Sequence, residues 1–149
     1  MYNNLLPVFN SSIIRTVLVN GDYTATFNQS GQMFLVDGTD IAGSSMEIIL
    51  PEPVYAGLYY TFLWSETSLG VVNIKTNNPN NSIEGFISAQ GNGAQAVDVN
   101  DASTEDKVTF AANVSVGSFV QFVCDGHKWI VRGQIYPANV SSAAFVNSN

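Results

Sequence analysis

Charged residues are scarce in this sequence. Only 11% of its 149 residues are Asp, Glu, Lys or Arg, whereas ordinary soluble domains carry roughly 25%. The five Lys and Arg residues are never adjacent, and the formal net charge is -7. Because nucleic-acid binding requires clustered cations that neutralise phosphates, we expect no nucleic-acid partner. The acidic residues are scattered, which fits a role in solubility better than an acidic docking surface.

Cysteine and histidine are almost absent, with one residue of each, Cys124 and His127. A lone cysteine cannot form an internal disulfide, and one histidine beside a hairpin tip supports neither a multi-histidine metal site nor a His-dependent triad. Acidic residues can be paired on paper for glycoside hydrolysis, but nearly all of them fall in predicted turns. We therefore expect no enzymatic activity, no catalytic residue, no cofactor and no metal site.

Long apolar runs are also missing. No stretch approaches the roughly 20 residues of a membrane-spanning helix, and no basic region precedes the short apolar run at the N-terminus. We expect a soluble, unprocessed chain with no membrane partner. No stretch longer than about ten residues shows the apolar period of a helix.

Short strand-like runs fill the chain instead. Hydrophobic residues make up 46% of it, and runs rich in β-branched and aromatic residues are separated by Gly, Asn, Asp and Pro. This pattern predicts an all-β fold, an antiparallel sandwich or barrel-like (β-tulip-like) single domain over residues 12–149, preceded by an extended arm over residues 1–11. The predicted strands cover 33–36, 46–50, 58–64, 71–76, 83–87 and 108–110, and residues 143–146 are interpreted as either a last strand or a docking segment. Gly85, in the middle of its strand, predicts a bulge or a close backbone approach.

Two further segments have a predicted conformation. Asn20-Gly21 separates strand-like residues 13–19 from 23–27, which suggests a hairpin. Residues 88–106 are rich in Gly, Ala, Asn and Asp, and we expect them to form the longest loop.

Residues 116–133 contain the strongest hairpin signal, Asp125-Gly126 between two apolar runs. A two-residue loop there predicts three pairs on the core face: Cys124 with His127, Phe122 with Trp129, and Val120 with Val131. The opposite face pairs Val123 with Lys128, Gln121 with Ile130, and Phe119 with Arg132. That face is too apolar for full solvation, so we expect a second sheet, an arm or another subunit to cover it.

Oxygen ligands are concentrated in residues 98–106, which include Asp98, Asn100, Asp101, Glu105 and Asp106. They could hold calcium, but the spacing lacks the glycine and terminal glutamate of an EF-hand. A solvated acidic loop is the favoured interpretation.

Four aromatic residues are candidates for a sugar-binding platform: Tyr55, Tyr59, Tyr60 and Trp64. Tyr60 and Trp64 share a strand face with Leu58 and Phe62, and the core interpretation is therefore stronger for these two.

Five segments together resemble a module of tailed-bacteriophage virion proteins, in particular head decoration (cement) proteins and some head-fibre proteins. They are Met46-Glu-Ile-Ile-Leu-Pro51, Ala56-Gly-Leu-Tyr-Tyr-Thr-Phe62, Ile83-Glu-Gly85, Val116-Gly-Ser-Phe-Val-Gln-Phe122 and Asp125-Gly-His-Lys-Trp-Ile-Val-Arg-Gly133. The resemblance spans roughly residues 24–133. It departs from the family pattern at Ser118, where an acidic residue is frequent, and in a longer loop over 98–107.

The resemblance implies a non-enzymatic virion protein on the outer surface of the head. It would be a homotrimer that binds the major capsid protein and reinforces capsid contacts. The expected contact residues are Leu5, Leu6, Val8 and Phe9 of the arm, with Phe119 and Ile130 of the hairpin. The alternative is a receptor- or carbohydrate-binding domain of a virion fibre.

Overall fold

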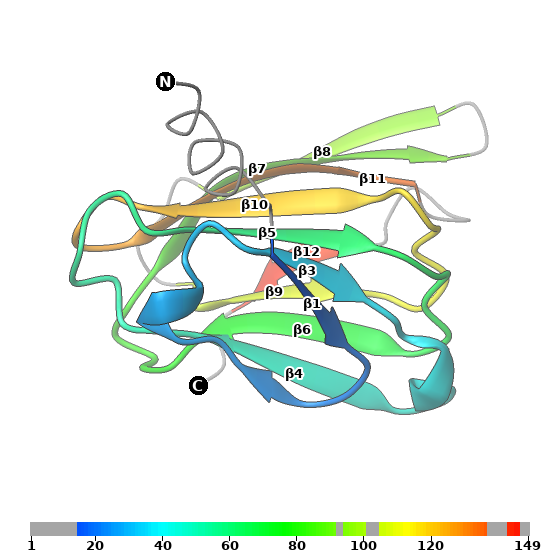
Figure 1. Cartoon of the computed structure of the whole chain (residues 1–149). Coiled ribbons are helices and arrows are strands. Elements are labelled where there is room, and N and C mark those ends of the chain that lie inside the picture. The colour runs from blue at the N-terminus through cyan, green and yellow to red at the C-terminus, as the bar shows by residue number, and fades with distance from the viewer. Residues whose placement is uncertain (1–14, 92–93, 101–104, 137–142, 147–149) are drawn as a thin grey trace, which may run out of the picture.

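Two β-sheets pack against each other in a computed structural model that describes residues 15–91, 94–100, 105–136 and 143–146 (Figure 1). The first sheet has seven strands in the order β1 (Thr16–Val19), β3 (Met33–Val36), β5 (Tyr59–Trp64), β10 (Phe119–Cys124), β11 (Trp129–Ile135), β7 (Ile83–Gly91) and β8 (Ala94–Asn100). The second has five, in the order β12 (Ala143–Val146), β9 (Lys107–Phe110), β6 (Val71–Thr76), β4 (Ser45–Leu50) and β2 (Tyr23–Thr24). Two 3-10 turns, η1 (Phe27–Gln29) and η2 (Thr39–Ile41), lie between strands. The predicted all-β sandwich is confirmed.

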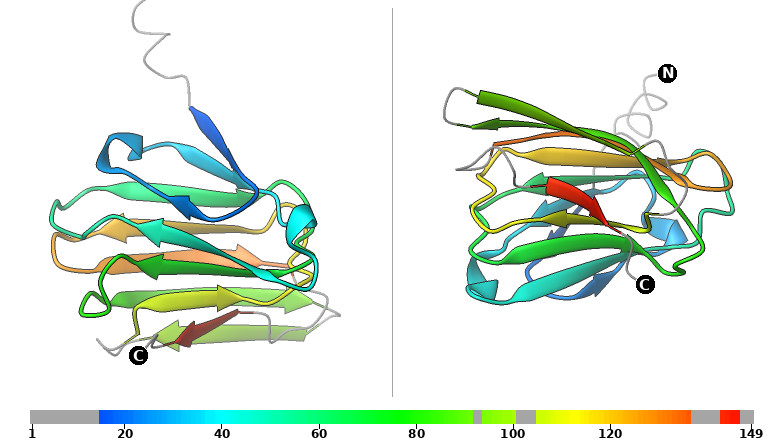
Figure 2. Two further views of the ribbon diagram at one scale, coloured as in Figure 1. Left: turned by 90° about the horizontal axis from the view of Figure 1, so that it is seen from below. Right: turned by 180° about the vertical axis from the view of Figure 1, so that it is seen from behind.

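Both sheets are mixed, whereas the sequence predicted an antiparallel sandwich. From β1 to β6 the chain crosses to the other sheet after every strand, so that β1, β3 and β5 run parallel in one sheet and β2, β4 and β6 run parallel in the other. Figure 2 shows these crossings from below and from behind. A strand in this part of the chain therefore pairs with the next strand but one, two crossings further on, because its immediate successor lies in the opposite sheet.

The predicted hairpin around Asn20-Gly21 is wrong for the same reason. β1 pairs with β3 and β2 pairs with β4. The Asp22 carboxylate accepts a 2.8 Å hydrogen bond from the Glu47 amide, which fixes this turn against β4. Turn chemistry marked where the chain bends, but it did not show which strands pair.

Large aromatic side chains fill the space between the sheets. The Phe34 and Phe62 ring centroids lie 5.1 Å apart, and Trp64 of the seven-stranded sheet meets Phe110 of the five-stranded sheet at 5.0 Å. The predicted core face of 58–64 is confirmed, because Tyr60, Phe62 and Trp64 are all buried. In 71–76 the alternating residues Val72 and Ile74 are buried as well. Burial of such side chains is the main stabilising contribution of the fold.

Gly85 makes the close backbone approach that its mid-strand position predicted. Its φ is +134°, and a β carbon there would collide with the carbonyl oxygen of Val131 on the parallel neighbour β11. Only glycine fits this position.

The β10–β11 hairpin is confirmed, but its loop has four residues rather than two. The Asp125 carboxylate accepts hydrogen bonds from the amides of His127 (2.8 Å) and Lys128 (2.9 Å), and the Asp125 amide donates to the Lys128 carbonyl. Of the loop residues, only Gly126 has a positive φ, whereas a two-residue type I′ loop needs two. The aspartate side chain thus stabilises a wider turn.

The wider turn shifts the predicted register by two residues. The observed core-face pairs are Cys124 with Trp129, Phe122 with Val131, and Val120 with Gly133, and the outward pairs are Val123 with Ile130, Gln121 with Arg132, and Phe119 with Gln134. A shift of two keeps every strand residue on its predicted face. His127 and Lys128, which were predicted as paired strand residues, lie in the loop instead.

Residues 88–106 do not form one long loop. β7 continues to Gly91, and β8 pairs with it in antiparallel register, for example Ser88 opposite Val97. Backbone pairing requires no particular side chains, so the low apolar content hid this second hairpin. The predicted strand 143–146 is confirmed as β12 and pairs with β9, as the view from behind in Figure 2 shows.

Candidate functional site: the outer face of the seven-stranded sheet

The side chains of the seven-stranded sheet that point away from the five-stranded sheet form its outer face. Strand register places Leu18, Leu35, Leu63 and Phe119 side by side on four neighbouring strands. We call these four residues the apolar row. Leu18 is 60% exposed and Phe119 is 39% exposed. With strands about 4.8 Å apart, the row is about 14 Å long.

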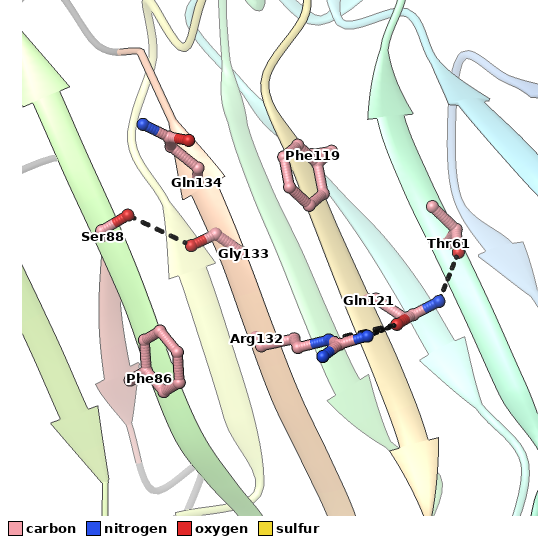
Figure 3. A pocket seen from close by; sticks show the side chains of 8 residues that line it. All are labelled: Thr61, Phe86, Ser88, Phe119, Gln121, Arg132, Gly133 and Gln134. Carbon is pink, nitrogen blue, oxygen red and sulfur yellow. Dashed lines mark hydrogen bonds between the residues drawn. The ribbon is translucent and has the colours of Figure 1, made fainter.

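A polar chain of hydrogen bonds runs beside the apolar row. Gln121 donates from Nε2 to Thr61 Oγ1 at 3.3 Å, and its Oε1 accepts from Arg132 Nη2 at 3.0 Å and from Nε at 3.3 Å. Figure 3 shows the three side chains reaching across β5, β10 and β11. In the described part of the chain the ion pairs join Lys75 to Glu47 and Lys128 to Glu84, so no carboxylate there pairs with Arg132.

An open hollow of about 470 Å³ lies over β5, β7, β10 and β11. The exposed rings of Phe86 and Phe119 line it, and Arg132 lies between them in Figure 3. Its other polar groups come from Thr61, Ser88, Gln121 and Gln134. The hollow thus combines apolar contact area with a hydrogen-bonded guanidinium, and its described lining residues include no carboxylate or imidazole.

A third row continues the outer face toward the hairpin tip. Tyr59 lies beside Val123, Val123 beside Ile130, and Ile130 beside Glu84. Ile130 is 42% exposed. The Lys128 ammonium donates a hydrogen bond to Glu84, and this bond raises the pKa of Lys128. This ion pair lies at the edge of the outer face next to the hairpin tip.

The predicted contact residues are only partly within the described residues. Phe119 and Ile130 both lie exposed on the outer face. The arm residues Leu5, Leu6, Val8 and Phe9 lie outside the described residues.

Sequence reasoning missed Leu18, Leu35, Leu63 and Phe86 as candidate contact residues. For Leu63, the alternation in 58–64 that places Phe62 and Trp64 in the core was the available signal, because it turns Leu63 outward. Phe86 and Leu18 became recognisable only once the strand pairing was known.

The candidate ion-binding segment 98–106 is divided by the structure. Asp98 and Asn100 belong to β8, Asp106 is buried, and residues 101–104 lie outside the described residues. Among the described residues, no three His, Cys, Asp or Glu side chains gather as metal ligands would.

The four candidate sugar-binding aromatics separate into two pairs. Tyr60 and Trp64 are buried in the core, whereas Tyr55 and Tyr59 are exposed.

Cys124 is buried, and this burial raises the pKa of its thiol. No described helix has the length and apolar character needed to span a membrane.

Neither a protein-family model nor a curated protein matches this sequence. The family resemblance therefore stays a prediction, and the geometry of the outer face is the basis for a functional proposal.

Proposed function

We propose that this chain is a non-enzymatic structural protein that binds a protein surface through the outer face of its seven-stranded sheet. The proposed surface is the outside of a bacteriophage head, built from the major capsid protein. The observation that carries the proposal is the apolar row of Leu18, Leu35, Leu63 and Phe119. Contiguous exposed apolar area on a domain with few charges is typical of an interaction surface.

The size of the outer face fits such a contact. Seven strands about 4.8 Å apart and about 3.3 Å of rise per residue give a face of roughly 29 by 20 Å, on the order of 600 Å². A stable protein interface buries about 800 Å² on each partner. The outer face supplies most of that area, and the arm over residues 1–11 would supply further contacts through Leu5, Leu6, Val8 and Phe9.

The polar groups of the outer face suit recognition better than catalysis. Thr61, Gln121 and Arg132 are hydrogen-bonded to one another, which holds the guanidinium in place. Acid–base catalysis calls for a titratable group near the reacting atom, and the residues that line this hollow in the described part of the chain include no carboxylate or imidazole. An Arg fixed between exposed rings would instead bind a carboxylate or carbonyl group of a partner.

The test is a charge substitution on the apolar row. Phe119→Asp places a carboxylate in the centre of the proposed interface and should weaken binding to empty heads, assembled without this protein, by at least tenfold in a co-sedimentation assay. Val116→Asp is the matched control, because Val116 is equally apolar and 59% exposed but lies in the loop before β10. Circular dichroism would verify that both variants fold. Unchanged binding of Phe119→Asp would refute the outer face as the contact surface.

The arm and the oligomeric state need separate measurements. We expect a homotrimer by size-exclusion chromatography with light scattering, and we expect deletion of residues 1–11 to abolish capsid attachment without unfolding the domain. Retained attachment of the deletion variant would remove the arm from the proposed interface.

A further inference from the structure

The loops at one end of the sandwich, on the left in Figure 1, form a second surface that is separate from the hollow of the outer face. We call it the loop end and define it by the segments 24–31, 50–55, 77–81 and 125–128. Two hollows of about 350 and 360 Å³ lie here, and Glu52 lines both. The first is bordered by Phe27 and Asn77, the second by Asn78 and His127. The shared residue shows that the two hollows adjoin each other, so an extended ligand can contact both.

Two exposed aromatic rings stand at the loop end. Phe27 is 41% exposed and Tyr55 is 63% exposed, and their ring centroids lie 5.5 Å apart in an edge-to-face arrangement. Phe27 lines the first hollow and Tyr55 extends the aromatic surface beside it. The two rings offer rigid apolar contact area at little cost in side-chain entropy.

Hydrogen bonds preorganise the turn that carries Phe27. The Thr26 amide donates to Gln29 Oε1 at 2.9 Å, and the buried Tyr60 hydroxyl donates to the Thr26 carbonyl at 2.9 Å. The position of Phe27 is thus set by a core residue, so that little ordering is needed on binding.

The segment that carries Glu52 is held as firmly. Pro51 and Pro53 on either side of Glu52 are buried, and the indole of Trp129 donates to the Pro51 carbonyl at 3.2 Å. The Glu52 residue itself is exposed. Its carboxylate accepts hydrogen bonds, while the nearby amides of Asn77 and Asn78 can both donate and accept.

Charge excludes one large class of ligands. The ionisable residues that line the two hollows are Glu52 and His127, and Lys128 next to them is paired with Glu84. With a formal net charge of -7 on the whole chain, an anionic ligand would be repelled. Aromatic rings, amides and one carboxylate together fit a ligand with apolar C–H faces and many hydroxyl groups.

We propose that the loop end binds a neutral oligosaccharide of at least two residues. The sugar C–H faces pack on Phe27 and Tyr55, and sugar hydroxyls donate to Glu52 and bond to Asn77 and Asn78. This activity goes beyond the proposed capsid contact and does not depend on it, because it uses different residues.

The experiment presents the full chain with a glycan array that contains neutral oligosaccharides and their uronic-acid and sialylated counterparts, followed by saturation-transfer NMR on the best neutral binders. We expect binding to neutral glycans alone. Tyr55→Ala and Phe27→Ala should each lower affinity at least tenfold, and Glu52→Gln should lower it several-fold because an amide oxygen is the weaker acceptor.

Phe86→Ala is the matched control, since Phe86 is an equally exposed ring on the outer face, and it should bind glycans like the wild type. Three results would each overturn the proposal: no neutral glycan binds, an anionic glycan binds better, or Tyr55→Ala and Phe27→Ala bind as the wild type does. The capsid-binding test uses Phe119→Asp on the outer face and none of the loop-end residues, so the two proposals can fail separately.

Discussion

The indole of Trp129 at the start of β11 donates its Nε1 hydrogen to the carbonyl oxygen of Pro51, 78 positions earlier in the chain. This bond lies in the core and joins the β10–β11 hairpin to the loop that follows β4. It connects the two sheets near the loop end, and it makes Trp129 a polar as well as an apolar component of the core.

We predict that Trp129→Phe lowers the free energy of unfolding more than Trp64→Phe does, by about 1–3 kcal/mol, the cost of leaving a buried acceptor unsatisfied. Both indoles are fully buried, so the loss of packing is similar. Trp64 Nε1, by contrast, has no hydrogen-bond partner among the described residues. Urea unfolding followed by far-ultraviolet circular dichroism measures both variants, and equal losses would show that the Pro51 bond contributes nothing.

Gly85→Ala should be strongly destabilising, by about 2–5 kcal/mol, because it combines an unfavourable positive φ with overpacking. The added methyl group would collide with the Val131 carbonyl on β11 and force β7 and β11 apart. Gly21→Ala is the control, since a β carbon at Gly21 meets nothing within 4 Å. Thermal unfolding of the two variants tests this prediction. A wild-type melting temperature for Gly85→Ala would mean that the two strands separate more easily than their register suggests.

The free energy of unfolding should fall at alkaline pH, because the Tyr60 hydroxyl ionises less readily in the folded chain than in the unfolded chain. Burial, with a smaller effect of Cys124, raises the pKa of Tyr60 to about 12, compared with about 10 in an unfolded chain. A raised pKa contributes stability that is complete below about pH 10 and is lost as the pH rises toward 12. Between these values the unfolded chain releases its proton and the folded chain keeps it.

The measurement compares urea unfolding of the wild type and Tyr60→Phe at several values between pH 9 and 11.5. The variant lacks both the hydroxyl and its bond to Thr26, so it should be less stable at pH 9 and should lose less stability as the pH rises. Parallel pH profiles for the two proteins would contradict the raised pKa.

Local patterns were sufficient to predict most strands and their faces. The alternation in 58–64 placed Tyr60, Phe62 and Trp64 in the core, and the bounds of β3, β6 and β12 were predicted to the residue. These features depend on side-chain periodicity within one segment, which the sequence displays directly.

Pairing between segments could not be predicted in the same way. Asn20-Gly21 has the composition of a hairpin turn, yet its two flanking strands lie in different sheets. The register of the β10–β11 hairpin depended on whether the Asp125 carboxylate would accept hydrogen bonds from the His127 and Lys128 amides. These bonds favour a four-residue loop over a two-residue loop, and the order of residue types alone does not show which of the two forms. The outer face was foreseen only for the residues of the β10–β11 hairpin, among them Phe119, Ile130 and Arg132. Leu18 and Phe86 reach this face through pairings with distant strands.

The winding of residues 16–76 from sheet to sheet has a consequence for how longer relatives of this chain could arise. We call the path from β3 through β4 to β5 one circuit: the chain leaves the seven-stranded sheet, passes through the five-stranded sheet and returns. Each circuit adds one strand to each sheet, and the returning strand lies parallel to the one before it. Duplication of a circuit would therefore extend the sandwich sideways and lengthen the outer face by one strand, while the β10–β11 hairpin and the loops beside it keep their geometry.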